Sequence, residues 1–458
     1  MKNTFNQNPI LAIATAPGKG GVGVVRFSFP KKSEFHTFIL HFLGRIPKLR
    51  HATYIELLDG ESTVLDQGIA LVFDAPASFT GEYVLEFQGH GGQGVLQAIV
   101  ARALDLSKQL SLSLRYAEPG EFTRRAFLND KIDLVQAEAV ADLINANTLA
   151  SVKAAALSLT GAFSKEVHLL ADKITHLRLL LEATLDFPEE EIDFLEQADA
   201  YGQLNQIMIT HSRLMQLAIE GQKFNEGIKI ALIGKPNVGK SSLLNVLSGQ
   251  DVSIVTDIPG TTRDRIEQVL HIRGLPITLV DTAGIRQTQD EIEKIGIQRT
   301  HLSIQEADLL LYITDDSSSS FAIEPEILEL IPSGLPILKV FNKVDLYQDV
   351  AVFPRDVIAI SAKNNQGLEQ LKDRVFELIG LSSPSENRFM ARQRHIDALK
   401  QAEIHLINAR QSAVLSDRSL DLFAEELRLA HNSLGEITGY LMPDDLLGLI
   451  FSRFCIGK

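Results

Sequence analysis

The sequence has few of the features that secreted or membrane-spanning proteins need. It contains one cysteine, Cys455, among 458 residues, so no internal disulfide can form and a reducing compartment is expected. Residues 1–10 lack the basic and apolar segments of a signal peptide, and no window approaches about 18 uninterrupted apolar residues. We therefore expect a soluble, cytoplasmic protein that has no membrane partner.

Positive charge is also scarce. The chain has 44 lysines and arginines against 58 aspartates and glutamates, which gives a net charge of −14. This balance excludes a general polyanion-binding surface, so any RNA contact must be local or shared with a partner.

The length predicts about two to four domains, and the pattern along the chain changes accordingly. Up to about residue 120, short apolar strands alternate with glycine-rich turns; the strands are expected at Ile10–Ala14, Val22–Phe27, Gly68–Phe73 and Tyr83–Phe87. Apolar residues at three- and four-residue spacing then predict helices from about 130 to 185 and over Leu204–Glu220. Gly221–Gly227 is expected to be a linker.

The most specific motif is Gly234-Lys235-Pro236-Asn237-Val238-Gly239-Lys240-Ser241, which fits the P-loop pattern G-x-x-x-x-G-K-[ST]. It follows the apolar run Ile228–Ile233 and precedes a helical stretch, which is the strand–loop–helix context that the motif requires. Backbone N–H groups of such a loop surround phosphates, Lys240 neutralises β- and γ-phosphate charge, and the Ser241 hydroxyl ligates Mg²⁺.

A second motif, Asn342-Lys343-Val344-Asp345, makes the expected base guanine. The Asp345 carboxylate can accept from the ring N–H and the exocyclic amine of guanine, whereas adenine would leave this charge unpaired. Ser361-Ala362-Lys363 follows a predicted strand and is expected to close over the base.

Two further motifs complete a GTPase set. Asp281-Thr282-Ala283-Gly284 follows the predicted strand Ile277–Val280, so Asp281 can hold Mg²⁺ through water and Gly284 can donate to the γ-phosphate. Thr261-Thr262-Arg263-Asp264 lies between the P-loop and this motif, where Thr262 is our choice for the second Mg²⁺ hydroxyl. Together the motifs predict a GTPase.

The position that often holds a water-orienting glutamine is apolar here. Ile285 and Arg286 follow the Asp281 motif, so another group must orient the attacking water. The acidic stretch Asp290–Lys294 can supply it, and the residues alone do not decide which carboxylate does so.

Helical sequence flanks the GTPase segment on both sides. Leu368–Ile379 ends that segment, a polar linker follows, and helices resume from Arg388 to about Gly439. We expect one helical domain interrupted by an inserted GTPase domain; two unrelated helical appendages are the alternative. Two glycine-rich segments, Gly18–Gly23 and Gly89–Gly94, match a dinucleotide fingerprint formally but lack its βαβ setting, so tight turns are favoured.

Several motifs together resemble one family. Phe454–Lys458 at the end of the chain, the inserted GTPase domain, and the segments Pro17–Gly23, Gln88–Gly92 and Glu118–Lys131 are similar to the bacterial tRNA-modification GTPases called MnmE or TrmE. The resemblance covers the whole chain. Lys19 and Pro259 depart from the residues common in the family, neither at a position we regard as essential.

The resemblance implies an α/β-plus-α fold: a small N-terminal α/β folate-binding and dimerisation domain, and a helical domain interrupted by a P-loop Ras-like GTPase domain. The implied boundaries are 1–122, 123–222, 223–380 and 381–458. It also implies a homodimer, a flavoprotein partner, MnmG, that carries FAD, and tRNA as substrate. The enzyme would install an aminomethyl or carboxymethylaminomethyl group at C5 of the wobble uridine with a reduced folate, 5-formyl- or 5,10-methylene-tetrahydrofolate. A regulatory or ribosome-assembly GTPase is the alternative.

The resemblance also assigns individual residues. Folate contacts would be Arg26, Glu86, Lys131 and Lys458, and a K⁺ ion would be held by Asn237, Thr256, Ile258 and Thr261. The implied catalytic residues are Glu293, which would orient water, Lys240 and Cys455. Motifs and resemblance together assign GTP binding to Asn237, Val238, Gly239, Lys240, Ser241, Ser242, Thr256, Asp257, Ile258, Pro259, Gly260, Thr261, Thr262, Asp281, Thr282, Ala283, Gly284, Asn342, Lys343, Asp345, Ser361, Ala362 and Lys363.

Overall fold

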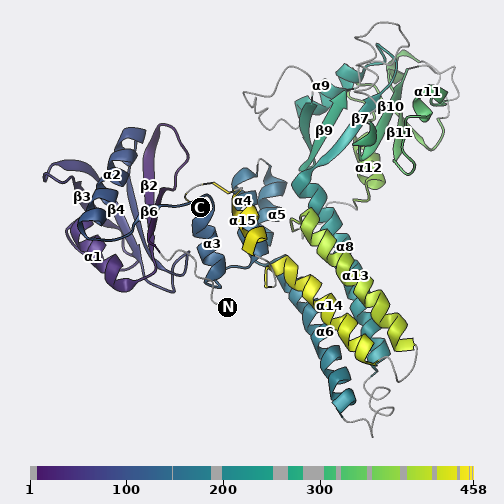
Figure 1. Ribbon diagram of the computed structural model, residues 1–458. Helices are drawn as coiled ribbons and strands as arrows, with labels where there is room; N and C mark the ends of the chain where they lie inside the picture. Colours follow the sequence, from purple (N-terminus) through teal and green to yellow (C-terminus); the bar gives the residue numbers. More distant parts are fainter. Residues whose placement is uncertain are drawn as a thin grey trace. The chain divides into compact units, whose positions relative to one another are not determined.

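The computed structural model divides the chain into two compact units (Figure 1). Unit 1 comprises Met1–Ala141 and Gly435–Lys458, and unit 2 comprises Asp142–Leu434. The structure describes residues 8–146, 148–186, 199–250, 267–281, 304–315, 321–347, 353–381, 389–414, 420–440, 444–452, 454, 455 and 457. No helix among these residues is both long enough and apolar enough to cross a membrane.

Unit 1 contains a six-stranded sheet in the order β3-β4-β5-β2-β1-β6. Its strands are β1 (Ile10–Ile13), β2 (Gly20–Phe29), β3 (Thr53–Leu58), β4 (Val64–Phe73), β5 (Tyr83–Gly91) and β6 (Arg115–Tyr116). Alternate strand residues such as Val25, Phe27, Ala70 and Val72 are buried against α1 (Lys32–Leu43) and α2 (Gln93–Gln109). The two-residue period of the strands therefore leaves the other residues of β2 and β5 outside this core.

The end of the chain belongs to unit 1. Helices α3 (Glu121–Leu128), α4 (Leu134–Asn145) and α15 (Asp444–Ser452) follow the sheet. A small core joins α4 to the C-terminal segment; its buried members are Leu134, Ala137, Leu447, Phe451 and Phe454.

The helical part of unit 2 is built from both flanks of the nucleotide-binding segment. Helices α5 (Leu149–Leu159), α6 (Ala162–Asp186) and α8 (Ala200–Glu226) precede it, and α13 (Gln393–Val414) and α14 (Leu420–Thr438) follow it. Helix α8 packs along α6 and α13, as Figure 1 shows, and buried His211 lies 2.9 Å from the Leu399 carbonyl oxygen. This pairing confirms one helical domain interrupted by an insertion.

The inserted domain is a sheet of the order β12-β11-β10-β7-β9-β8. Its strands are β7 (Ile228–Ile233), β8 (Glu267–Ile272), β9 (Leu275–Asp281), β10 (Leu309–Thr314), β11 (Ile337–Phe341) and β12 (Val357–Ala359). All neighbours are parallel except β8 and β9. Among the described residues, this domain also contains the helices α9 (Lys240–Gln250), α11 (Pro325–Leu328) and α12 (Leu368–Leu378) and the short 3₁₀ helix η2 (Val344–Leu346). The carboxyl ends of the parallel strands meet at one edge, where such sheets bind ligands.

Two local predictions were wrong. Gly221–Gly227 is not a linker, because α8 continues to Glu226 and only Gly227, with φ of 78°, leaves the helix. Gly221 lies inside α8, where a Cβ would come 2.4 Å from the Phe389 carbonyl oxygen, so this glycine permits close helix packing.

The glycine segments are strand rather than tight turn over much of their length. Gly20 and Gly23 belong to β2, and Gly89 and Gly91 belong to β5, paired across the two strands. A Cβ at Gly91 would lie 2.5 Å from the Gly20 carbonyl oxygen. These glycines let the backbones of β2 and β5 approach each other closely, whereas the sequence had predicted tight turns.

Candidate functional site

The P-loop joins β7 to α9 and curls around Lys240. A Cβ at Gly234 would lie 2.2 Å from the Ile313 carbonyl oxygen, and Asn237 and Gly239 have φ of 66° and 98°. The Lys240 ammonium donates to the carbonyl oxygens of Gly234, at 2.6 Å, and Lys235, at 3.3 Å. The loop therefore holds a positive charge at the start of α9, where the first helical N–H groups favour an anion.

Asn342, directly after β11, ties this loop to the loop after β12. Its side-chain amide donates to the Val238 carbonyl oxygen at 2.8 Å and accepts from the Ala362 N–H at 3.1 Å. Asn342 is almost completely buried, and a Cβ at Gly239 would lie 2.2 Å from its Nδ2. One buried amide thus fixes the spacing of three loops that the sequence assigned to one ligand.

Lys343 and Asp345 extend the same arrangement. Lys343 donates to the Asn237 carbonyl oxygen at 2.7 Å and pairs with Asp315 at 2.6 Å. The Ser361 hydroxyl donates to Asp345 Oδ1 at 2.5 Å, and the same hydroxyl accepts from the Asn364 N–H at 3.2 Å. Ser361, in the loop expected to close over the base, therefore orients Asp345, the carboxylate expected to bind guanine.

The motif residues that the structure describes lie near the ends of the parallel strands, where the sequence predicted them. Asn237–Gly239, Asn342, Lys343 and Ser361–Lys363 lie in the loops that follow parallel strands, whereas Lys240–Ser242 begin α9 and Asp345 lies in η2. Ser241, the Mg²⁺ ligand we expect, is exposed in the first turn of α9. Asp281 is the last residue of β9, although its side chain is not described.

The remaining predicted residues of this site lie outside the described residues. They are Thr256, Asp257, Ile258, Pro259, Gly260, Thr261, Thr262, Thr282, Ala283, Gly284 and Glu293. Among the described residues there is no group of three or more His, Cys, Asp or Glu side chains that could hold a metal ion. A Mg²⁺ ion on hydroxyls and phosphates needs no such group.

Sequence reasoning missed Asp315. It follows the buried strand β10 and pairs with Lys343, and its carbonyl oxygen accepts from the Tyr347 hydroxyl at 2.7 Å. The available signal was its position: a polar residue directly after an apolar strand, at the same edge as the P-loop.

In unit 1 the structure brings together two residues implied in folate binding, Arg26 and Glu86, and Gly457, the residue before Lys458. Arg26 of β2 and Glu86 of β5 are register partners, and the Arg26 Nε donates to Glu86 Oε1 at 2.8 Å. Arg26 also donates to the Gly457 carbonyl oxygen at 3.4 Å. Lys458 itself lies outside the described residues, but Gly457, the residue before it, contacts Arg26.

Two phenylalanines that the sequence did not single out complete this site. The Arg26 guanidinium carbon lies 5.9 Å from the Phe79 ring centre and 5.8 Å from that of Phe122. Such contacts hold a guanidinium by attraction to the aromatic faces. Phenylalanines are common core residues, so nothing in the sequence distinguished these two.

Two other implied residues, Lys131 and Cys455, also belong to unit 1. Lys131 is exposed, and its side-chain carbons are the atoms that a Cβ at Gly81 would meet at 3.3 and 3.4 Å. Cys455 is exposed, and its carbonyl oxygen accepts from the Gly120 N–H at 3.3 Å. The tail is therefore packed: Phe454 is buried and a Cβ at Gly457 would lie 2.6 Å from the Ile13 carbonyl oxygen. The residues of Phe454–Lys458 alone favour a frayed tail without a packing role, and this interpretation is wrong.

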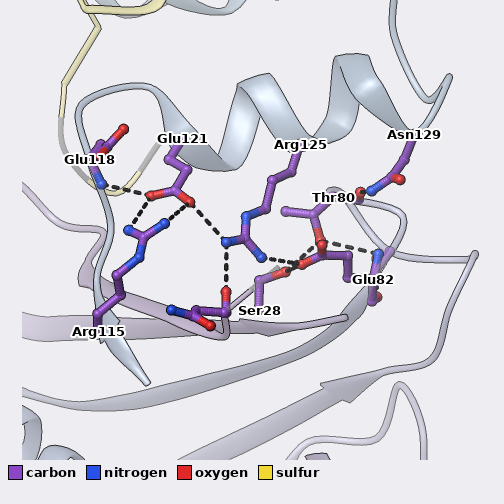
Figure 2. Close-up of polar contacts among 10 residues, drawn as sticks. Ser28, Thr80, Glu82, Arg115, Glu118, Glu121, Arg125 and Asn129 are labelled. Carbon is purple, nitrogen blue, oxygen red and sulfur yellow. Dashed lines mark hydrogen bonds and ion pairs between the residues drawn. The ribbon is translucent and has the colours of Figure 1, made fainter. Parts of the chain in front are cut away.

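A buried ion network, shown in Figure 2, holds α3 and with it Phe122. Glu121 accepts from Arg115 at 2.7 Å, from Arg125 at 2.8 Å and from the Glu118 N–H at 2.9 Å. Arg125 also donates to Glu82, at 2.9 Å, on the segment that leads into β5. Burial by itself would raise the pKa of Glu121, but the three hydrogen bonds outweigh it and lower that pKa below its ordinary value.

Comparison with known proteins identifies the family. The family model described as the MnmE helical domain matches residues 134–455, and the one described as the GTP-binding protein TrmE N-terminus matches residues 9–131. A tRNA modification GTPase MnmE of Ralstonia nicotianae is 50% identical, over 98% of this chain and 96% of that protein. The chain belongs to the MnmE family.

Other MnmE proteins are similar to the same degree. The MnmE of Bordetella parapertussis is 51% identical over 98% of this chain and 99% of its own length. Among solved structures, Aquifex aeolicus Era is 26% identical, covering 42% of this chain and 68% of that one, with a TM-score of 0.28. The MnmE relatives span the whole chain, so the family resemblance inferred from the sequence is confirmed.

Proposed function

We propose that the protein is a K⁺-dependent GTPase that acts in modification of the tRNA wobble uridine. The observation that carries the proposal is the Asn342 bridge, which assembles P-loop, base-reading motif and closing loop into one guanine-nucleotide site in a chain of the MnmE family. GTPase activity in tRNA modification follows from the family; the cation and the rest of the chemistry are our inference.

Within the nucleotide site, each residue would have a separate task. Lys240 would neutralise phosphate charge, Asp345 would select guanine, Ser361–Lys363 would close over the base, and Ser241 with Thr262 would hold Mg²⁺. Asn237 with Thr256, Ile258 and Thr261 would hold K⁺, which supplies positive charge where an arginine finger would otherwise act. Glu293 would orient the attacking water, because no glutamine stands after the Asp281 motif.

We infer that the Arg26 site binds a reduced folate. Glu86 offers a carboxylate for the N–H edge of a pterin, and Arg26 offers donors for carbonyl or carboxylate groups. The rings of Phe79 and Phe122, whose centres lie 5.9 and 5.8 Å from the Arg26 guanidinium carbon, suit a flat ring system. The folate, 5-formyl- or 5,10-methylene-tetrahydrofolate, would supply the one-carbon unit, and Lys131, Lys458 and Cys455 would complete the pocket.

The remaining parts of the proposal come from the family resemblance. The chain would form a homodimer through residues 1–122, would act with the flavoprotein MnmG, which carries FAD, and would work in the cytoplasm. We retain the division into 1–122, 123–222, 223–380 and 381–458 as the functional domains. The product would be an aminomethyl or carboxymethylaminomethyl group at C5 of the uridine.

A census of wobble uridines tests this function. A strain that lacks the gene is complemented with the wild-type protein or with Arg26→Ala, and tRNA nucleosides are measured by mass spectrometry. We expect the wild type to restore the modified uridine and the variant not to do so, while its GTPase rate stays normal. Restoration of growth and ribosome profiles without any change in wobble uridine would favour the alternative, a regulatory or ribosome-assembly GTPase.

A further inference from the structure

One stretch of unit 1 is basic, although the chain as a whole is acidic. Residues 31–51 contain five lysines and arginines and one carboxylate, Glu34, whereas the whole chain has a net charge of −14. The five are Lys31, Lys32, Arg45, Lys48 and Arg50, and His36, His41 and His51 lie among them. We call this region the α1 basic surface.

The fold fixes these side chains on the outside of unit 1. Helix α1 buries Phe35, Phe38, Ile39 and Phe42 against the sheet, and these rings stack on one another and on those of β2. All five basic residues are exposed. Of the five, Lys32 lies in the first turn of α1, Lys31 directly precedes the helix, and Arg45, Lys48 and Arg50 follow its end.

The contacts within the surface leave most of its charge uncompensated. Lys31 pairs with Glu34 at 2.9 Å, an exposed pair of small energetic worth. Arg45 and Arg50 instead donate to neutral carbonyl oxygens, of Tyr54 and Ala77, each at 2.6 Å. These bonds order the two guanidinium groups without neutralising them.

A helix of 12 residues is about 18 Å long, so the lysines at its start and the basic residues after its end can meet different phosphates of one nucleic acid strand. A membrane surface is the other anionic partner to consider, but membrane-bound amphipathic helices turn an apolar face to the lipid. Here that face of α1 is buried, and Leu40, Ile46 and Leu49 are the large apolar side chains exposed among residues 31–51. The charge pattern therefore favours RNA.

We propose that the α1 basic surface binds the phosphate backbone of the tRNA substrate. The proposal rests on the function proposed above, and it assigns the RNA contact to unit 1, which also carries the Arg26 site. It fits the composition, because a chain with this net charge can hold RNA only through a local concentration of positive charge.

The test compares two double variants of the full-length protein that lose the same charge. Lys32→Gln with Lys48→Gln removes two exposed lysines of the surface, and the control, Lys153→Gln with Lys165→Gln, removes two exposed lysines from α5 and α6. Binding to a tRNA transcript is followed by fluorescence anisotropy over a range of salt concentrations, and the GTPase rate is measured on each protein.

We expect the surface variant to bind tRNA roughly tenfold more weakly at about 0.1 M salt, with a salt slope smaller by about two. The control should bind within about twofold of wild type, and GTPase rates should be equal. Equal loss in both variants, no loss in either, or no tRNA binding by the wild type would each overturn the proposal. So would unchanged tRNA binding with lost binding to phosphatidylglycerol vesicles.

The nucleoside census separates this proposal from the function on which it rests. If the wild type restores the modified wobble uridine but the surface variant binds tRNA normally, the α1 basic surface alone is wrong. If the wild type does not restore modification, the proposed function is wrong whatever the variants bind.

Discussion

The two candidate sites are assembled from opposite kinds of parts. In unit 2 the nucleotide site consists of loops that follow β7, β10, β11 and β12, joined by contacts to backbone carbonyl and N–H groups. In unit 1 the Arg26 site is centred on one side chain, whose partners are the Glu86 carboxylate, 60 residues away, and the Gly457 carbonyl oxygen, 431 residues away. The loops of the nucleotide site can be recognised in the sequence as short motifs. The Arg26 site forms only when residues far apart in the sequence meet in the folded unit.

The comparison predicts that the unit 1 site is the more sensitive to one buried charge. Glu121→Gln would weaken the pairs to Arg115 and Arg125, at an expected cost of about 3 kcal/mol in the free energy of unfolding of unit 1. Urea denaturation followed by circular dichroism measures it, with the exposed Glu118→Gln as control. Nucleotide hydrolysis in unit 2 should be unaffected.

The same variant has a defined pH dependence. The pKa of Glu121 is lower in the folded protein, so its contribution is present above the unfolded value and is lost as the pH falls through the folded value. The difference between wild type and Glu121→Gln should therefore be full at pH 7 and shrink below about 4. A constant difference across this range would mean that the charge of Glu121 does not matter.

In unit 2, loss of the carboxylate that we propose as catalytic should affect rate alone. Glu293→Ala should lower GTP hydrolysis roughly 10²-fold with nearly unchanged nucleotide affinity, because it removes a group that positions water. Single-turnover hydrolysis and nucleotide titration measure the two quantities, and Glu291→Ala is the matched control from the same acidic stretch. Weaker GTP binding with normal turnover at saturation would make Glu293 structural.

The C-terminal tail tests whether the two sites are separable. Deleting Cys455–Lys458 removes the Gly457 contact to Arg26, and we expect folate affinity to fall by about 1.5–3 kcal/mol while GTP hydrolysis continues. Isothermal titration with a reduced folate and a GTPase assay on the same protein measure both.

A control for that deletion is Cys455→Ser, which keeps the packed backbone. Unchanged folate affinity after the deletion would exclude the tail from the pocket. Loss of both activities would show that Gly457, buried against Ile13, is needed for the fold as well.

The smallest effect we predict concerns the cation. Replacing K⁺ by Na⁺ should slow GTP turnover at least tenfold, on the order of 1.4 kcal/mol in barrier height, because Asn237 and its loop partners would hold the larger ion. Folate affinity should be the same in both salts. Equal turnover in K⁺ and Na⁺ would remove the cation from the mechanism.

The sequence predicted the nucleotide site of unit 2 better than the Arg26 site of unit 1. The P-loop and the Asn342 motif were found because backbone geometry demands particular residues at fixed spacing, and the structure joins them as expected. Arg26 and Glu86 were reached through family resemblance, since no local pattern announces a pair that meets across two strands. Phe79, Phe122 and Asp315 were missed because an ordinary residue type gains its role only from tertiary neighbours.

The errors have related causes. Gly221 suggested a linker because glycine disfavours helix, yet close packing on the segment at Phe389 requires it there. The tail seemed dispensable because flexible residues end the chain, yet Phe454 packs on Phe451 in the core shared with α4. Tertiary packing overrode local propensity in both places.

The central claim is that unit 2 contains a nucleotide site in which Asp345 recognises guanine. Exchanging that carboxylate for an amide tests this claim most directly. The wild type should hydrolyse GTP and not ATP. Asp345→Asn should lose GTP hydrolysis at least 10²-fold and gain xanthosine triphosphate hydrolysis, because xanthine carries a carbonyl where guanine carries its amine, and the amide at 345 can donate to it. Equal use of ATP by the wild type, or unchanged preference for GTP in the variant, would contradict the account.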